Sequence, residues 1–573
     1  MHVEKVPNRG SRPAYLLREG WREQGGVRKR TLANLSHWPL EQIEALRAVL
    51  RGEPMVPARQ RFRVERSLPH GHVEAVLGLM SKLGVDQLLS SRRCRQRDLV
   101  MAMIAQQLLA PCSKLAATRS WDSTTLAHEL EVAGADENEL YEALDWLLSR
   151  KNRIEGKLAK RHLGEEARAL YDVTSSTYYG RTCPLAERGY NREHKGRNCI
   201  TWGLLADAEG RPVALETYEG ATGDPATLQD QANKLRKRFG LSRVVLVGDR
   251  GMLTQARIDA LKEHPELGWI SALPSQAIRA LAEQGELQLS LFDKQNLAEI
   301  TCEAYPGERL MVCYNPVLAE DRQRTRNELL EQTEKELARI QAEVNRRTRT
   351  PLTAGEIGQK AGRAAHRFKM AKHFQLDIQD GHFAYQRDAE SIEAEARLDG
   401  VYIVRTSEPA QQLSAEDAVR AYKSLEQVEQ AFRCMKTLDL RVRPIRHRTE
   451  AHVKAHMFLC MLAYYVEWHM RQALAPILFQ DEELAQTRWT RDPVAPAETS
   501  AQAKQKKNAR HTGEGWPVHS LQTLLQELGT RAKNICRVNA QEAEGAFPFH
   551  FEDITEPTPF QQHVFDLLGL NCA

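Results

Sequence analysis

An α/β protein with a mixed central sheet is the fold class that this sequence predicts, and three observations support it. The hydrophobic period changes from helical to strand-like at Ala167. Short apolar runs and helical segments then alternate as far as Ala272. Two of the runs, 168–172 and 244–249, end in an aspartate. At 573 residues the chain is too long for one core, so we expect several domains around this sheet.

The composition favours an intracellular protein and leaves its partner open. The net charge is only +4, yet basic residues cluster, for example in 59–66 and 441–448. Such a cluster is either a solvated surface or a phosphate-binding patch, and we take Arg59 and Arg61 as candidate DNA contacts. The ten cysteines form no Cys-x-x-Cys pair, which is typical of reduced thiols in the cytosol. We find no signal core and no apolar run of membrane-spanning length.

The N-terminal part divides into two predicted regions. In region 1–62, Ala14–Trp21 and Val27–Leu35 flank a Gln-Gly-Gly turn, which predicts a β-hairpin, and a helix is expected over Leu40–Leu50. In region 63–165 apolar residues recur at three- and four-residue spacing. We interpret this second region as a helical DNA-binding module with basic connections.

The element order from 166 to 272 predicts an RNase H-like core. The expected order is three strands, helix, strand, helix, strand, and the first three strands can pair through short turns while the later ones need helical crossovers. The sheet should therefore be mixed. The predicted elements are the strands Ala167–Thr174, Ile200–Ala206 and Pro212–Tyr218, the helix Ala226–Phe239, the strand Val244–Gly248, the helix Thr254–Lys262 and the strand Gly268–Ala272.

The rest of the chain is predicted to interrupt and then complete this core. We expect 273–399 to be an insertion of strands and a charged helical hairpin, whose seam is formed by Leu330, Leu337, Ile340 and Val344. Region 400–475 then completes the core with a strand at Gly400–Thr406 and two helices, Ala415–Lys436 and Glu450–Leu474. The Pro-, Ala- and charge-rich segment 476–515 is predicted to be a linker, and 516–573 a C-terminal helical region.

Asp172 and Asp249 are the first candidate site residues. Asp172 lies among apolar strand residues, where a buried carboxylate costs several kcal/mol unless a partner such as a cation compensates it. Asp249 follows the run Val244–Val247, and sites in α/β sheets gather at such carboxyl ends. The alternatives are an edge-strand or turn position for Asp172, and a loop position starting the next helix for Asp249.

A third carboxylate, Glu429, lies on a helical stripe. Tyr422, Leu425, Glu429 and Lys436 are spaced by three, four and seven residues, so on one helix they share a face, and Arg433 follows Glu429 by one turn. The alternative is an exposed helix with a Glu429–Arg433 salt bridge worth under about 1 kcal/mol. Three carboxylates from two strands and a helix are typical of sites that bind hard divalent cations for phosphoryl transfer.

The spacing Tyr422-x2-Leu425-x3-Glu429-x6-Lys436 resembles the Y-x2-R-x3-E-x6-K signature of IS4-superfamily DDE transposases, in the IS1634-like group. The resemblance extends over most of the chain and includes the strand end at 248–251. Leu425 stands where the signature has arginine, and Arg433 is the candidate to supply that phosphate contact instead.

The resemblance implies a function and a site. Asp172, Asp249 and Glu429 would be catalytic and would bind two Mg²⁺ or Mn²⁺ ions, while Tyr422, Arg433, Lys436 and Arg250 would contact DNA phosphates. The implied protein is a bacterial insertion-sequence transposase, cytoplasmic and associated with the nucleoid. It would bind terminal inverted repeats as a homodimer on double-stranded DNA, then cleave the transposon ends and join them to target DNA by cut-and-paste transposition.

Two other functions and one other metal remain as alternatives. The chain could be an RNase H-like nuclease without strand transfer, or a DNA-binding relative with an inactive centre, against which the intact acidic trio argues. His447, His452 and His456 suggest zinc, because the last two are four residues apart. Since no glutamate is placed as in His-Glu-x-x-His, we expect these histidines to pack or to flank DNA.

Overall fold

The computed structural model describes residues 1–8, 12–23, 25–53, 62–164, 167–191, 193–223, 227, 234, 238–241, 243–262, 267–287, 295–538 and 550–571. Contacts divide the chain into two compact units. The first comprises Met1–Pro69 and Arg531–Glu556, and the second comprises His70–Thr530 and Pro557–Ala573. Each unit is described by itself below.

The first unit contains two small antiparallel sheets. Strands β1 (His2–Val6), β2 (Ala14–Glu23) and β3 (Gly26–Asn34) form one sheet, on which α1 (Leu40–Leu50) packs through Ile43. The predicted hairpin and helix are confirmed, and Gly25 has the positive φ (84°) that the tight turn requires. The other sheet has the order β17 (His550–Ile554), β16 (Ala532–Val538), β4 (Phe62–Pro69). These strands were not predicted from the sequence, because their partners lie far apart in the chain.

The second unit begins with the predicted helical region, in which α5 is the most buried element. Nearly all of α5 is inaccessible because it packs against α3, α8 and α17. A capping box formed by Asp136 and Glu139 begins α8. The helices are α3 (Gly71–Lys82), α4 (Val85–Leu89), α5 (Arg95–Leu109), α6 (Lys114–Ser120), α7 (Leu126–Glu129) and α8 (Glu137–His162), with α17 at Glu450–Ala473.

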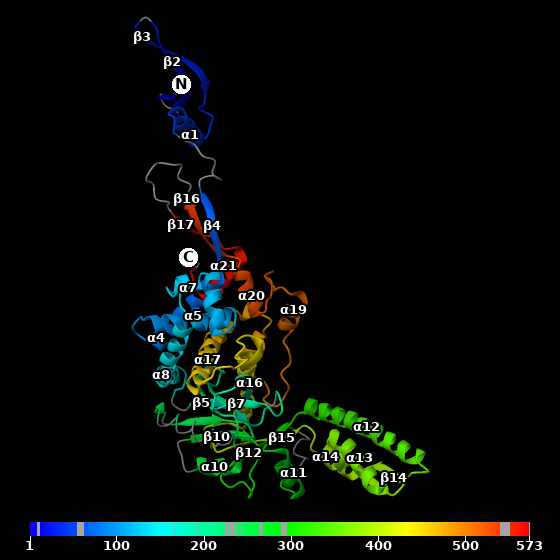
Figure 1. Ribbon diagram of the computed structural model, residues 1–573. Helices are drawn as coiled ribbons and strands as arrows, with labels where there is room; N and C mark the ends of the chain where they lie inside the picture. Colours follow the sequence, from blue (N-terminus) through cyan, green and yellow to red (C-terminus); the bar gives the residue numbers. More distant parts are fainter. Residues whose placement is uncertain are drawn as a thin grey trace. The chain divides into compact units, whose positions relative to one another are not determined.

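A nine-stranded mixed sheet forms the centre of this unit (Figure 1). Its strands are β5 (Ala167–Thr177), β6 (Glu187–Arg188), β7 (Asn198–Asp207), β8 (Pro212–Glu219), β9 (Val244–Val247), β10 (Leu267–Ala272), β11 (Leu297–Ile300), β12 (Arg309–Tyr314) and β15 (Val401–Thr406). Strands β8, β7 and β5 pair antiparallel, and β5, β9 and β10 pair parallel. The predicted mixed RNase H-like core is therefore confirmed. Strands β11 and β12 extend the same sheet through β15.

The charged helical hairpin of the insertion is also present. Helices α12 (Pro316–Arg346) and α13 (Ala354–Arg367) lie beside β13 (Phe374–Gln379), β14 (His382–Arg387) and α14 (Ala389–Ala396) (Figure 1). The predicted seam residues Leu330, Leu337 and Val344 are buried in this cluster, and Ile340 packs against it. Two further helices flank the sheet strands, α10 (Gln255–Leu261) and α11 (Ser275–Glu283). Most of the predicted helix 226–239 lies outside the described residues.

The prediction of one continuous helix from Ala415 to Lys436 is wrong. The structure has α15 (Ala415–Lys423), α16 (Leu425–Arg433) and then a π-helical segment, Cys434–Leu438. At the first break the Ser424 hydroxyl donates a hydrogen bond to the carbonyl oxygen of Arg420 (2.9 Å), a bond of the kind that bends helices. Tyr422 and Glu429 therefore lie on different helices.

The segment predicted as a linker, 476–515, is packed in the structure. Helix α18 (Glu482–Gln486) is followed by the 3₁₀ turn Thr487–Trp489 and by α19 (Ala501–Ala509). Its residues Ile477, Leu478 and Val494 are buried against the core. The C-terminal region adds α20 (Leu521–Leu528) and α21 (Pro559–Leu568). Among the described residues no single helix could cross a membrane; only the bent pair Arg95–Leu109 and Lys114–Ser123 meets the length and composition test.

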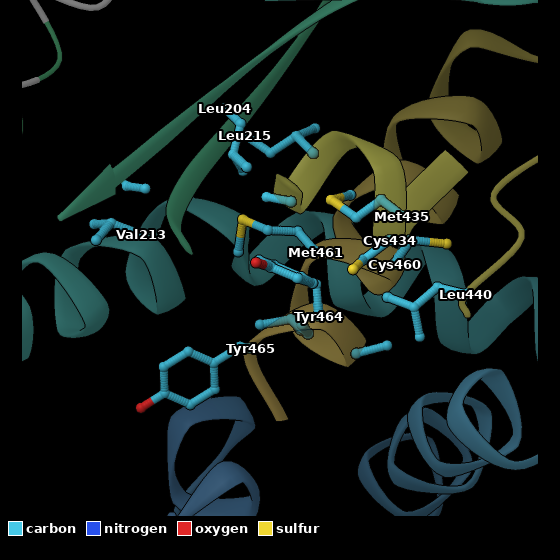
Figure 2. Close-up of a cluster of buried hydrophobic side chains, with 14 of the residues drawn as sticks. Leu204, Val213, Leu215, Cys434, Met435, Leu440, Cys460, Met461, Tyr464 and Tyr465 are labelled. Atoms are coloured by element: carbon cyan, nitrogen blue, oxygen red, sulfur yellow. The ribbon is translucent and has the colours of Figure 1, made fainter. Parts of the chain in front are cut away.

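Helix α17 is the central support of the second unit. Every residue from Met457 to Val466 is buried, and the helix contacts β8, α5 and α8. Figure 2 shows Met461 and Tyr464 of this helix between Leu215 of β8 and the side chains of Cys434 and Met435. The most apolar stretch of the chain is thus a core helix, and it connects the sheet with the segment that follows α16.

An ionic network also joins α17 to the π-helical segment. The Arg471 guanidinium donates from Nε to Glu467 (2.6 Å) and from Nη2 to Asp439 (2.7 Å). Glu467 is fully buried, and its second oxygen has no hydrogen-bond partner among the described residues. Burial raises the pKa of Glu467 to about 7, with Arg471 opposing the shift and Asp439 adding to it. Folding therefore favours the protonated form of this carboxyl group.

Replacing Glu467 by Gln should make the stability of the protein less sensitive to pH. Because the folded pKa lies above the ordinary value of 4.5, the wild type loses stability as the pH rises from 4.5 to about 7. Relative to the wild type, Glu467→Gln should gain about 1–3 kcal/mol across this window, since one pKa unit corresponds to about 1.4 kcal/mol. Urea unfolding followed by tryptophan fluorescence measures the difference. If the difference does not change with pH, Glu467 is already ionised in the folded protein.

Candidate active site

The pairing of two parallel strands places Asp172 and Asp249 side by side. Leu170 of β5 is in register with Val247 of β9, and each aspartate lies two residues further along. Side chains two residues apart on a strand share a face, so the two carboxylates meet on one face at the carboxyl ends of the strands. Both aspartates are half-buried.

Local hydrogen bonds orient these carboxylates. The Oδ1 atom of Asp172 accepts from the N–H of Val173 (2.7 Å). The Oδ1 atom of Asp249 accepts from the N–H groups of Gly251 (3.0 Å) and Met252 (2.8 Å), which fixes the turn after β9. The loop position considered for Asp249 is therefore present, and it coexists with a position beside Asp172.

Helix α16 brings Glu429 to the same place. Its residues Val428, Ala431 and Phe432 are buried, and the helix packs on β5, while Glu429 is exposed. The three carboxylates line one cavity of about 260 Å³. The full lining is Asp172, Val173, Asp249, Tyr422, Lys423, Leu425, Glu426 and Glu429. Leu425, at the signature's arginine position, gives this cavity an apolar wall.

Two charged lining residues, Lys423 and Glu426, were not predicted from the sequence. Glu426 precedes Glu429 by three residues, so the helical spacing that selected Glu429 could also have selected Glu426. Lys423 precedes Glu426 by three residues, and the same spacing places it at the cavity. Its ammonium group donates to the carbonyl oxygen of Val494 (3.1 Å), and burial lowers its pKa. That contact depends on the segment predicted as a linker.

All three carboxylates raise the pKa of the Tyr422 hydroxyl. Burial raises the pKa of Tyr422 to about 12, and the charges of Asp249, Asp172 and Glu429 add to the shift, whereas Arg250 opposes it. The phenol is consequently protonated at neutral pH and available as a hydrogen-bond donor at the cavity wall. Arg250 itself is exposed next to Asp249.

Lys436 is bound to β5 and lies outside the cavity lining. Its ammonium group donates to the carbonyl oxygen of Ser175 (2.7 Å) and to the Thr174 hydroxyl, and it lies 3.8 Å from a Glu193 oxygen. Thr174 shares a strand face with Asp172, so Lys436 is near the carboxylates along β5. Arg433 is exposed and is likewise absent from the described lining of the cavity.

The other candidate residues are placed as follows. Glu429 and Arg433 form no ion pair in the part of the chain that the structure describes, so the surface salt bridge considered as an alternative is absent there. Arg59 and Arg61 lie outside the described residues.

The three histidines pack with their neighbours. The rings of His447 and His456 lie 4.6 Å apart, and burial lowers the pKa of His456 to about 3. His452 stacks on Tyr141 (4.8 Å between ring centroids). Among the described residues, the one group of possible ligand atoms that all lie within 4.8 Å of one another is Cys434, Asp439 and Glu467. Its two carboxylates already bind Arg471, and no histidine belongs to it.

Comparison with protein families agrees with this architecture. Residues 165–466 match the transposase DDE domain, and residues 2–56 match the N-terminal domain of IS1634 family transposases. The first match spans more than half of the chain, which therefore belongs to the DDE transposases, enzymes of metal-dependent phosphoryl transfer on DNA. Within that class, both matches together identify an IS1634-like transposase of insertion sequences, as the resemblance in the sequence had indicated. Comparison with curated protein sequences gives no match.

Divalent ions should stabilise the protein through these carboxylates. The four carboxylates around this cavity, those of Asp172, Asp249, Glu426 and Glu429, repel each other, so in EDTA the Glu429→Gln variant should be more stable than the wild type by up to about 1 kcal/mol. Saturating Mn²⁺ should reverse the order, because an ion at 100 times its dissociation constant adds about 2.7 kcal/mol. Thermal unfolding with and without Mn²⁺ measures both effects.

A matched control for this measurement is Glu328→Gln, on the exposed surface of α12. It should retain the full Mn²⁺ stabilisation of the wild type. Equal stabilisation of the wild type and Glu429→Gln would remove Glu429 from the metal site.

Proposed function

We propose that the chain is an active cut-and-paste transposase in which Asp172, Asp249 and Glu429 are the catalytic, metal-binding residues. The observation that carries the proposal is the single cavity to which two paired strands and α16 each contribute one carboxylate. This cavity lies within the segment that matches the DDE domain. The substrates would be the terminal inverted repeats of the element and then the target DNA.

The donor set of the cavity fits two Mg²⁺ or Mn²⁺ ions. Carboxylate oxygens are the ligands that these hard cations prefer, and Asp172, Asp249 and Glu429 would hold them, with Glu426 on the same wall. When bound, such ions lower the pKa of a water or a 3′-hydroxyl and stabilise the leaving oxygen of an in-line displacement. The protein supplies rigid placement, because two of the three carboxylates come from the central sheet.

The surrounding residues would bind and orient the DNA backbone. The protonated Tyr422 hydroxyl can donate to a non-bridging phosphate oxygen, and Arg250 and Lys436 would supply positive charge near the carboxylates. Exposed Arg433 would replace the contact that Leu425 cannot make. Arg59 and Arg61 would contribute to end binding from the basic segment near the N-terminus.

The proposed organisation follows from these roles. Regions 1–62 and 63–165 would bind DNA, 166–272 with 400–475 would form the catalytic core, and 273–399 would be an insertion into that core. The region from 476 onwards would complete the fold, as 476–515 and 516–573. The active form would be a homodimer on double-stranded DNA, because two transposon ends must be brought together, in the cytoplasm of a bacterium.

Single replacements in the acidic trio should separate cleavage from binding. Asp172→Ala, Asp249→Ala and Glu429→Ala should each lower Mg²⁺-dependent cleavage of the element's end DNA by at least about 100- to 1,000-fold, the size of effect seen when one electrostatic stabiliser of a transition state is lost. Binding of the same DNA should stay within about threefold of the wild type, because phosphate contacts by basic residues dominate affinity. Gel analysis of cleaved and joined products measures the first effect.

The outcomes of this experiment discriminate among the candidate functions. Glu328→Ala is the control and should cleave like the wild type. Near-normal cleavage by any of the three variants would contradict the site assignment. Cleavage by the wild type without joined products would identify a nuclease, and tight binding without any cleavage would identify an inactive relative.

A further inference from the structure

We propose that a second cavity, next to the carboxylates, binds a backbone phosphate of the DNA strand through Arg488 and Arg491. This inference rests on the proposed function and deepens it, since it assigns a further DNA-binding site to the same catalytic unit. The cavity has a volume of about 700 Å³. It is bounded by α15 and α16, by the end of α17 and by residues 480–497.

The two cavities share a wall. Lys423 and Glu426 line both of them, so the second cavity lies across the α15–α16 bend from Asp172 and Asp249. A DNA strand whose scissile phosphate lies at the carboxylates would therefore have neighbouring phosphates within reach of the second cavity, because successive phosphates are only a few ångströms apart.

The charged lining of the second cavity is predominantly basic. Its cations are Arg420, Lys423, Arg471, Arg488 and Arg491, and its acids are Glu209, Glu426 and Asp481. Three of the cations already have protein partners. Arg420 donates to the carbonyl oxygen of Arg491 (2.9 Å), Lys423 to that of Val494, and Arg471 to two carboxylates. Asp481 accepts from the N–H groups of Leu484 and Ser500.

Arg488 and Arg491 differ from Arg420, Lys423 and Arg471 in the partners of their side chains. Neither guanidinium forms an ion pair with any residue that the structure describes, and the Nη1 atom of Arg491 is buried without a hydrogen-bond partner. The 3₁₀ turn at Thr487–Trp489 holds the two side chains close, with the N–H of Arg491 donating to Thr487 (3.0 Å). Two like charges in a partly enclosed space are unfavourable unless an anion binds between them.

The titration of Arg488 is consistent with this geometry. Burial lowers the pKa of Arg488, and the positive charge of Arg491 lowers it further, while the acids Glu426 and Glu209 oppose the shift. Glu426 and Glu209 therefore offset only part of the effect of burial and of the Arg491 charge on Arg488. A phosphate would restore the balance, and guanidinium groups bind phosphate through two parallel hydrogen bonds.

The size and walls of the cavity favour a phosphate on a DNA strand over a free phosphate ion. One wall is the half-buried indole of Trp468, and further walls carry the side-chain amides of Gln427, Gln430, Gln472 and Gln480. The Arg211 guanidinium already lies over the Trp468 ring (5.3 Å to its centroid), so contacts to bases or sugars fall to the amides, which hydrogen-bond to them. The part of the cavity lined by these amides therefore suits a nucleotide attached to the phosphate that Arg488 and Arg491 bind.

Salt dependence of binding tests the proposal directly. Each phosphate that a protein neutralises contributes about 0.9 to the slope of log K against log[salt] for double-stranded DNA. For the element's end DNA, the Arg488→Gln/Arg491→Gln double variant should therefore reduce the magnitude of this negative slope by about 1. It should also weaken binding about tenfold at moderate salt. Fluorescence anisotropy with labelled end DNA over a KCl series gives both numbers. Arg488→Lys/Arg491→Lys should retain the wild-type slope, because the charge is kept.

The matched control is Arg324→Gln/Arg339→Gln on α12, where each guanidinium is already paired with an acid, Asp321 or Glu336. This pair should leave the slope unchanged. If the double variant does not fold, Arg488→Met/Arg491→Met removes both charges while keeping the length of these half-buried side chains, and it gives the same test. A folded variant with the wild-type slope would overturn the phosphate site.

Glu429→Ala distinguishes this outcome from failure of the proposed function. If Glu429→Ala loses cleavage but keeps the wild-type slope, while the arginine variants also keep it, the second site is wrong and the transposase site stands. If the wild type neither binds nor cleaves end DNA, both proposals fall.

Discussion

The parallel pairing of β5 with β9 is the constraint on which the rest of the site depends. Every residue of β9 is buried, and Leu170 and Val247 are in register at its carboxyl end. A slip of one residue would turn one aspartate away from the other, because successive side chains on a strand point to opposite faces. The burial of the strands thus fixes the carboxylates as firmly as it fixes the core.

Helix α17 transmits this rigidity to the third carboxylate. It packs beneath the sheet and contacts the segment after α16 through apolar side chains and through Arg471. Because Asp439 and Glu467 are both held by this one guanidinium, the end of α16 cannot shift without disturbing a buried ionic network. The exposed Glu429 therefore stands on a helix that is anchored at its C-terminal end and along its buried face.

Opposite charges lie on the two sides of the α15–α16 bend. Carboxylates that raise the pKa of Tyr422 occupy one side, and Arg488 and Arg491, which form no ion pair with the described residues, occupy the other. An enzyme of phosphoryl transfer on DNA requires this combination, because cations must collect at the reacting phosphate while the protein itself neutralises neighbouring ones. The bend at Ser424 lets one short helical segment serve both sides.

Local sequence patterns determined most elements of the central sheet and three of the cavity's carboxylates. Apolar runs that end in aspartate predicted the strand positions of Asp172 and Asp249, and helical spacing selected Tyr422 and Glu429, because strand and helix periods are properties of neighbouring residues.

Only the tertiary structure decided which of these elements contact each other. The contact of Lys423 with Val494 and the packing of 476–515 depend on groups about 70 positions apart in the chain. The pairing of β4 with β16 likewise joins the two ends of the chain. Proline, alanine and charged residues carry no periodic signal of such contacts, so composition alone indicated a linker where the fold has a wall of a cavity.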